Sequence, residues 1–307
     1  MTTPKEYYED NGYYIFPKLI PDNLIDDLLE KYKAEILSSN DYFFRQSSNR
    51  WEKSKITEHG YCKESFLNVH DYSNYPAFCE AAREIFCSQQ IREALTQITG
   101  SQEHNLMQSM LFDLNAATPP HQDWYYLDSM PNGHLLAGWF ALEDIYEEAG
   151  RFYVLPKSNK VELDLTEDEI AANATYVKKM RKYVDSRKSD IYAPALKKGD
   201  VLFWNSRTVH GSSETQNPQY SRKSLTAHYL PSQYQSGSRY AKSPAAIDYG
   251  IYKGMKYALT PNKRKIYSPA NKLRADFSDF VTNQPKLARM ANSVREILKT
   301  SKDKHSK

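Results

Sequence analysis

The stretch between Asn105 and Leu230 contains a series of short runs rich in aromatic and β-branched residues. Turn-forming residues separate each run from the next, which is typical of antiparallel strands. The runs are Asn105 to Leu114, His134 to Leu142, Phe152 to Leu155, Asp200 to Trp204 and Leu225 to Leu230. A helix is expected between the third and fourth runs, so two groups of strands flank a helical insertion near residues 161–197. This order predicts a mainly β protein with flanking helices and a jelly-roll core.

Helical patterns flank and interrupt these runs. The capping-box pattern Thr166-Glu167-Asp168-Glu169 would begin the inserted helix. Apolar residues at helical spacing predict further helices from Leu24 to Ile36, from Pro76 to Thr99 and from Gln284 to Lys299, and a short strand is expected from Tyr13 to Phe16. At roughly 100–200 residues per domain, 307 residues would form one large domain or two small ones. We expect one domain, residues 1–307, with supporting elements in 1–104, the core in 105–231 and a basic, Tyr-rich extension in 232–307.

Composition excludes several classes of protein. No run approaches the roughly 18 apolar residues of a membrane span, and the N-terminus lacks a basic stretch followed by an apolar segment. The three cysteines, Cys62, Cys79 and Cys87, contain no C-x-x-C pair, so reduced thiols in a cytoplasmic protein fit better than a disulfide framework. An aromatic content of 13% excludes a disordered chain. No feature indicates an oligomeric state.

Positive charge is concentrated in the last quarter of the chain. Residues 232–307 carry 16 lysines and arginines against five acidic residues. The densest group comprises Lys253, Lys256, Lys263, Arg264 and Lys265, interleaved with Tyr252, Tyr257 and Tyr267. Such a group could attract an anionic small molecule, or it could simply form a solvated surface. Nucleic acid is a minor alternative because no nucleic-acid-binding motif accompanies the charge.

The tripeptide His121-Gln122-Asp123 is the sharpest local signal in the sequence. Residues i and i+2 of an extended segment point to the same face, so His121 and Asp123 could hold one metal ion together. His210, which follows the predicted strand ending at Trp204, is the best candidate for a third ligand. Two imidazoles and one carboxylate on one face of a metal form the facial triad of non-haem iron(II) oxygenases. A lone H-x-D is weak, because a single histidine is more often a structural group than a ligand.

The order of the neighbouring signals strengthens the metal hypothesis. The H-x-D is followed by Gly199-Asp200-Val201-Leu202-Phe203, then by His210, and then by Arg222 at the head of the last predicted strand. A buried guanidinium at that position could hold a distal carboxylate through a two-pronged contact. Iron together with such a clamp is the arrangement that a 2-oxoglutarate cosubstrate requires.

These motifs resemble the phytanoyl-CoA dioxygenase (PhyH-like) family of Fe(II)/2-oxoglutarate-dependent oxygenases. The matching segments are TPPHQDWYYLD at 118–128, GWFALEDI at 138–145, GRFYVLPKSNK at 150–160, KGDVLFWNSRTVHGSS at 198–213 and SRKSLTAHYLP at 221–231. With the N-terminal GYYIFPKLIPDNLIDDL, the resemblance spans roughly residues 7–231. It implies a double-stranded β-helix (jelly roll, cupin-like) core. It further implies Fe(II) held by His121, Asp123 and His210, with 2-oxoglutarate bound by Arg222.

Further cosubstrate contacts follow only from the resemblance. Ser212 matches a position that often touches a 2-oxoglutarate carboxylate, and Gln108 matches an amide beside the cosubstrate. Trp139 matches a wall of the same pocket, and Ser224 is a further possible contact. The alternatives are core packing for Trp139 and a cross-strand hydrogen bond for Gln108. Asp123 stands where halogenating relatives have a small residue, which argues against halogenation.

The resemblance implies a dioxygenase that uses O2 and hydroxylates an unactivated C–H bond of a small molecule, with release of succinate and CO2. A cupin-like metal hydrolase or isomerase that uses no 2-oxoglutarate, and a non-catalytic binding module, are the alternatives. Tyr125, Tyr126 and Arg151 are candidates to face the substrate. Arg151 and Asn159 depart from the pattern of many relatives. Arg45, Asn49, Arg50 and Trp51 form a polar and aromatic stretch that could contribute or could be ordinary loop packing.

Overall fold

A large sheet forms the centre of the computed structural model, which describes residues 2–161, 163, 166, 168–169, 173–237, 243–260 and 273. Along this sheet the strands follow the order β1, β9, β7, β11, β5, β14, β13, and β4 pairs with β5. Their bounds are β1 Tyr13–Phe16, β4 Phe66–Leu67, β5 His104–Phe112, β7 Leu136–Ala141, β9 Val201–Asn205, β11 Ser224–Pro231, β13 Tyr249–Tyr252 and β14 Met255–Ala258. All pairs are antiparallel except β14 with β5. Four of the five strands predicted between Asn105 and Leu230, namely β5, β7, β9 and β11, therefore belong to this sheet.

A second layer of short strands faces this sheet. It contains β8 (Phe152–Val154), the third predicted strand, paired with β10 (His210–Ser212). A separate pair joins β6 (Asp128–Met130) to β12 (Gln235–Gly237). Trp139, Leu202 and Trp204 of the large sheet pack against Phe152 and Val154 of β8 in one apolar cluster. Two layers of strands enclosing a common core form the jelly roll that the sequence predicts.

Alternation along β11 separates the two faces of the large sheet. Leu225, Ala227 and Tyr229 belong to the core between sheet and helices. Ser224, Thr226 and His228 therefore point to the opposite face, into the interior of the jelly roll, because successive side chains of a strand alternate. The residues of this strand that can reach a ligand are the even-numbered ones.

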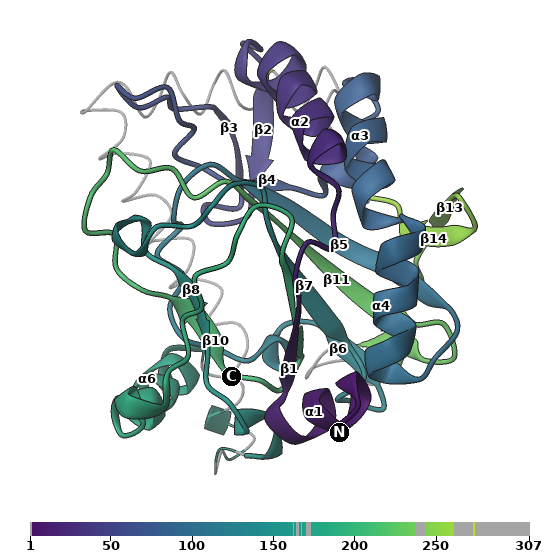
Figure 1. Cartoon of the computed structure of the whole chain (residues 1–307), viewed down its shortest axis with the longest axis vertical. Helices are drawn as coiled ribbons and strands as arrows, with labels where there is room; N and C mark the ends of the chain where they lie inside the picture. Colours follow the sequence, from purple (N-terminus) through teal and green to yellow (C-terminus); the bar gives the residue numbers. More distant parts are fainter. Residues whose placement is uncertain are drawn as a thin grey trace, which may run out of the picture.

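Helices cover the outer face of the large sheet (Figure 1). They are α1 (Pro4–Asn11), α2 (Asp22–Lys31) with its π-helical continuation Tyr32–Leu37, α3 (Pro76–Phe86) and α4 (Gln89–Thr99). The single helix expected from Pro76 to Thr99 is wrong, because the chain breaks at Cys87 and Ser88. Ser88 adopts an extended conformation and its hydroxyl accepts a hydrogen bond from the Ile91 N–H, so it caps a new helix.

The inserted helix is α6 (Asn173–Asp185), on the side of the molecule where β8 and β10 lie (Figure 1). Tyr176, Met180 and Val184 of α6 pack with Tyr125, Leu155 and Val209. Upstream, the Thr166 N–H donates to the Glu169 carboxylate and the Glu169 N–H donates to the Thr166 hydroxyl, as the capping box predicts. No helix among the described residues is long and apolar enough to cross a membrane.

Two further regions form hairpins that the sequence patterns did not predict. The polar stretch around Arg45 and Trp51 forms a hairpin of β2 (Tyr42–Arg45) and β3 (Arg50–Lys53), in which Phe44 lies opposite Trp51. The hairpin of β13 and β14 extends the large sheet beyond residue 231. The helix expected from Gln284 to Lys299 lies outside the described residues.

Candidate metal centre

His121, Asp123 and His210 form one compact cluster. One potential ligand atom from each lies within 4.8 Å of the others. Both imidazole Nε2 atoms are 3.5 Å from Oδ1 of Asp123. This confirms that the H-x-D and the distant histidine meet, although 87 residues separate Asp123 from His210.

Backbone pairing brings the two histidines together. The His121 N–H donates to the His210 carbonyl and the His210 N–H donates to the His121 carbonyl, each at 3.0 Å. His210 begins β10, whereas Asp123 begins a short 3₁₀ turn, Asp123–Tyr125. Gln122 between them is extended, so His121 and Asp123 project to one side as the spacing predicts.

Each ring is oriented by a backbone carbonyl. Nδ1 of His121 is 2.9 Å from the Pro119 oxygen, and Nδ1 of His210 is 3.0 Å from the Thr208 oxygen. Since a carbonyl only accepts, Nδ1 carries the proton in the neutral ring and the Nε2 lone pair faces the cluster. Two imidazole nitrogens and one carboxylate oxygen on one side suit a divalent transition metal and leave its other side open.

The charge states of the cluster also suit a cation. Burial lowers the pKa of His210 to about 4, so this ring is neutral at pH 7. Burial opposes ionisation of Asp123, but the surrounding His210, His228 and His121 outweigh it and hold its pKa well below the usual range. For His121, burial favours the neutral ring, but the hydrogen bond and charge of Asp123 raise its pKa above the ordinary value.

The second carboxylate oxygen of Asp123 has partners that the sequence did not single out. The Trp204 indole N–H donates to Oδ2 at 2.8 Å, and Nε2 of His228 lies 3.4 Å from the same oxygen. His228 lies on the interior face of β11, the face that it shares with Ser224. The sequence could have indicated His228, because alternation along a strand places it on the same face as Ser224, four residues earlier.

Arg222 is a buried cation beside the cluster. It is 3% exposed, and its Nη1 donates to the Gly150 carbonyl at 3.0 Å and to the Ser212 hydroxyl at 3.1 Å. Burial lowers its pKa to about 10. Its Nε and the hydroxyl of Ser224 are buried without a hydrogen-bond partner, and no carboxylate among the described residues forms an ion pair with it. An incoming carboxylate would satisfy these groups, so the residues fit 2-oxoglutarate.

The other two cosubstrate candidates lie on neighbouring strands. Trp139 is 2% exposed, its ring stacks on Phe152, and the Arg222 guanidinium carbon is 5.8 Å from its ring centre. It therefore serves both core packing and the Arg222 environment. Gln108 of β5 lies directly opposite His228 of β11.

The three substrate candidates differ in placement. Tyr126 is half-exposed, its ring centre is 5.8 Å from that of His121, and its hydroxyl donates to Asn173 of α6. Tyr125 is fully buried and stacks on Tyr176 at 3.6 Å, so it supports α6. Arg151 contacts the Ile145 carbonyl and Glu147.

Arg45 is 1% exposed and donates to the Ser65 carbonyl and the Ser54 hydroxyl, so it links β2 to the residue that precedes β4. Lys253 and Lys256 of the basic segment belong to the β13–β14 hairpin, which lies at the far edge of the large sheet from β8 and β10 (Figure 1). Lys253 pairs with Glu84 of α3 at 2.6 Å, while Lys263, Arg264, Lys265 and Tyr267 lie outside the described residues.

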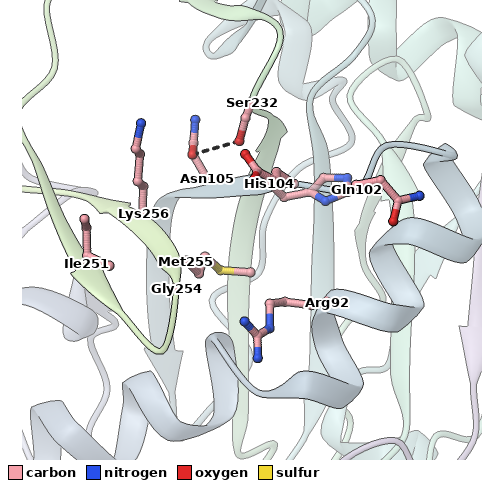
Figure 2. A pocket seen from close by; sticks show the side chains of 10 residues that line it. Arg92, Gln102, His104, Asn105, Ser232, Ile251, Gly254, Met255 and Lys256 are labelled. Atoms are coloured by element: carbon pink, nitrogen blue, oxygen red, sulfur yellow. Dashed lines mark hydrogen bonds between the residues drawn. The ribbon is translucent and has the colours of Figure 1, made fainter.

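A cavity of about 300 Å³ lies near this edge, between α4 and the β13–β14 hairpin (Figure 2). Arg92 and Lys256 line it, together with Asn105, which is bonded to Ser232. Arg92 also donates to the Lys253 carbonyl. No predicted site residue apart from Lys256 lines this cavity.

A jelly-roll core that brings two histidines and one carboxylate to one side of a potential metal site is typical of non-haem iron(II) oxygenases. The family model described as phytanoyl-CoA dioxygenase (PhyH) matches residues 8–224. The chain therefore belongs to the PhyH family, as the motifs predict. The peroxisomal phytanoyl-CoA dioxygenase of Bos taurus is 27% identical over 114 residues, which is 36% of this chain and 33% of that protein. The chain thus matches about a third of the length of this curated relative.

Solved structures share the fold at low sequence identity. The carbocyclase SnoK from nogalamycin biosynthesis is 14% identical with a TM-score of 0.56, covering 84% of this chain and 95% of its own. The epimerase SnoN, in complex with Fe3+, α-ketoglutarate and nogalamycin RO, is 16% identical with a TM-score of 0.55, covering 83% and 96%. EctD from S. alaskensis, with 2-oxoglutarate and 5-hydroxyectoine, is 17% identical with a TM-score of 0.54, covering 86% of each chain.

Proposed function

We propose that this protein is an Fe(II)- and 2-oxoglutarate-dependent dioxygenase that hydroxylates an unactivated C–H bond of a small molecule. The observation that carries the proposal is the facial triad beside Arg222, a buried guanidinium without a carboxylate partner among the described residues. Membership of the PhyH family supports it. We further propose one domain and a cytoplasmic location, because Cys62, Cys79 and Cys87 are free, buried thiols.

Each residue has a distinct role in this proposal. His121, Asp123 and His210 would hold the metal on one side. Arg222 and Ser224 would bind and orient the distal carboxylate of 2-oxoglutarate, and Ser212, hydrogen-bonded to Arg222, would help to align it. Bound Fe(II) and 2-oxoglutarate would supply, with O2, the chemistry that oxidises a C–H bond and releases succinate and CO2.

The surrounding apolar residues would keep water away from the reacting groups. Trp139 and Phe152 pack beside Arg222 and His210, respectively. Gln108 lies on the interior face next to His228 and would contact the cosubstrate. Tyr126, on the exposed side of His121, would meet the substrate.

Two alternatives receive less support from the residues. A cupin-like metal hydrolase or isomerase needs no carboxylate clamp, yet Arg222 is buried at a cost that only a ligand or partner offsets. A non-catalytic binding module needs neither the oriented imidazoles nor Arg222. The substrate could be anionic, but Lys253 pairs with Glu84, and the β13–β14 hairpin that carries Lys253 and Lys256 lies at the far edge of the sheet.

Succinate formation tests the proposal. Purified protein supplied with Fe(II), ascorbate and O2 should convert 2-oxoglutarate to succinate, with stimulation by a substrate found in small-molecule screening. A product heavier by one oxygen atom, labelled from ¹⁸O2, would identify hydroxylation. Unlabelled product that has lost two hydrogens would indicate desaturation or ring closure instead. Absence of succinate in a metal-loaded sample with the true substrate would contradict the proposal.

A further inference from the structure

His228 is a buried polar residue that the proposed catalytic roles do not use. It lies on β11 opposite Gln108 of β5 and Ala137 of β7, and it points into the interior of the jelly roll. Its Nε2 is 3.4 Å from Oδ2 of Asp123, and its side chain is 11% exposed. Its Nδ1 is buried without a hydrogen-bond partner in the described part of the chain.

The two oxygens of Asp123 face different surroundings. Oδ1 is 3.5 Å from both Nε2 atoms of His121 and His210 and is therefore the oxygen available to a metal. Oδ2 receives the Trp204 N–H and faces His228 on the other side. A carboxylate held in this way already presents Oδ1 to the two imidazoles, whereas an unrestrained carboxylate would lose rotational freedom when an ion binds and would therefore bind it more weakly.

We propose that His228 is a positioning residue, which donates its Nε2–H to Oδ2 of Asp123 and, with Trp204, holds this carboxylate in a single-oxygen binding orientation. The proposal rests on the metal site assigned above.

A comparison within the chain argues against a purely structural role. His70 is a fully buried histidine whose two ring nitrogens both have partners, the Ser109 hydroxyl at 2.6 Å and the Ala258 carbonyl at 2.9 Å. Nε2 of His228 lies near Asp123 and its ring contacts Trp204, but Nδ1 has no hydrogen-bond partner among the described residues, which costs free energy. An apolar residue would fill the same interior position without that cost, as Ala137 does on the next strand.

Two amide variants separate the contact from the bulk of the side chain. In His228→Gln the amide N–H can reach the position of Nε2, whereas in His228→Asn the side chain is too short to reach Asp123. The measurement is Co(II) affinity by calorimetry, without O2 or 2-oxoglutarate, so that turnover plays no part. His228→Asn should bind Co(II) about tenfold or more weakly, while His228→Gln should stay within about threefold of wild type.

Matched controls complete the experiment. His70→Gln removes another buried histidine and should lower the unfolding temperature while leaving Co(II) affinity unchanged. Trp204→Phe should also lower the affinity for Co(II). In the double variant with His228→Asn, the fold-loss of Co(II) affinity should differ from the product of the two single fold-losses, because both residues act on Oδ2. Circular dichroism of the metal-free variants checks their folding.

The outcomes distinguish this inference from the proposed function. If Asp123→Ala abolishes Co(II) binding but His228→Asn binds like wild type, the positioning role is overturned and the metal site stands. If His228→Gln and His228→Asn are equally weak, the Nε2 contact is not what matters, and the inference also fails. If Asp123→Ala itself binds Co(II) like wild type, the metal site is wrong.

Discussion

The indole N–H of Trp204 donates a 2.8 Å hydrogen bond to Oδ2 of Asp123, so a strand of the large sheet orients a carboxylate that begins a turn. Trp204 itself is packed among Trp139, Leu202 and Phe152. The position of the carboxylate is thereby coupled to the packing of the jelly-roll core.

The first prediction concerns Asp123. Asp123→Ala should abolish metal binding and turnover, because two imidazoles remain and the facial set is incomplete. Metal content of the purified protein and succinate formation are the measurements. Asp190→Ala, which removes an exposed partner of Arg187, is the control and should keep both properties. Hydroxylation by Asp123→Ala at the wild-type rate would show that the triad is assigned wrongly.

The second prediction concerns Arg222. A buried charge-assisted pair with a carboxylate contributes a few kcal/mol, so Arg222→Ala should weaken 2-oxoglutarate binding about 100-fold or more. Arg222→Lys should restore little, because an ammonium lacks the planar fork. Calorimetric titration of 2-oxoglutarate into the metal-loaded variants gives the affinity. Unchanged affinity in Arg222→Ala would remove the cosubstrate assignment.

The third prediction is that the metal-free protein loses stability in acid. Burial lowers the pKa values of His70, His104 and His210 to about 4 in the folded state, against an ordinary 6.5. Between these values the unfolded chain binds more protons, so stability falls as the pH decreases from about 6.5 towards 4.

Each of these histidines contributes on the order of 3 kcal/mol across that interval. Denaturant unfolding at a series of pH values measures the slope. His70→Gln should be less stable at pH 7 and should show a shallower decline in acid, since one titrating group is gone. A slope identical to that of wild type would contradict the assignment for His70.

The fourth prediction concerns the break between α3 and α4. Ser88→Ala removes the hydroxyl that accepts from Ile91, so it should lower the free energy of unfolding by about 1 kcal/mol. Ser88→Gly should cost only a few tenths of a kcal/mol, because glycine is tolerated at this position. Chemical denaturation of both variants tests this order. Equal stability of wild type and Ser88→Ala would show that the cap contributes nothing.

Sequence patterns predicted the parts of this molecule that depend on local chemistry. Short runs of aromatic and β-branched residues identified the strands, and the spacing of His121 and Asp123 predicted one face for both side chains. Apolar periodicity alone joined α3 and α4, because it continues across Ser88, where a side-chain cap begins a new helix.

Contacts between distant strands were harder to predict. His228 reaches Asp123 only because β11 lies beside β7 and β5 in the folded sheet. Tyr125 follows the H-x-D closely but turns into the core, where stacking on Tyr176 buries it. Arg45 is charged and yet buried, since ring faces of Phe43 and Phe66 and polar oxygens surround it.

The reciprocal backbone bonds between His121 and His210 have a consequence for metal selection. Because folding itself sets the spacing of these two ligands, little conformational entropy is left to lose when an ion binds. A site of this kind accepts any divalent ion of suitable size, and Ni(II), Cu(II) and Zn(II) bind such donors more tightly than Fe(II). The proposed metal site would therefore be open to mismetallation, and the ions supplied during synthesis would decide how much of the protein carries Fe(II).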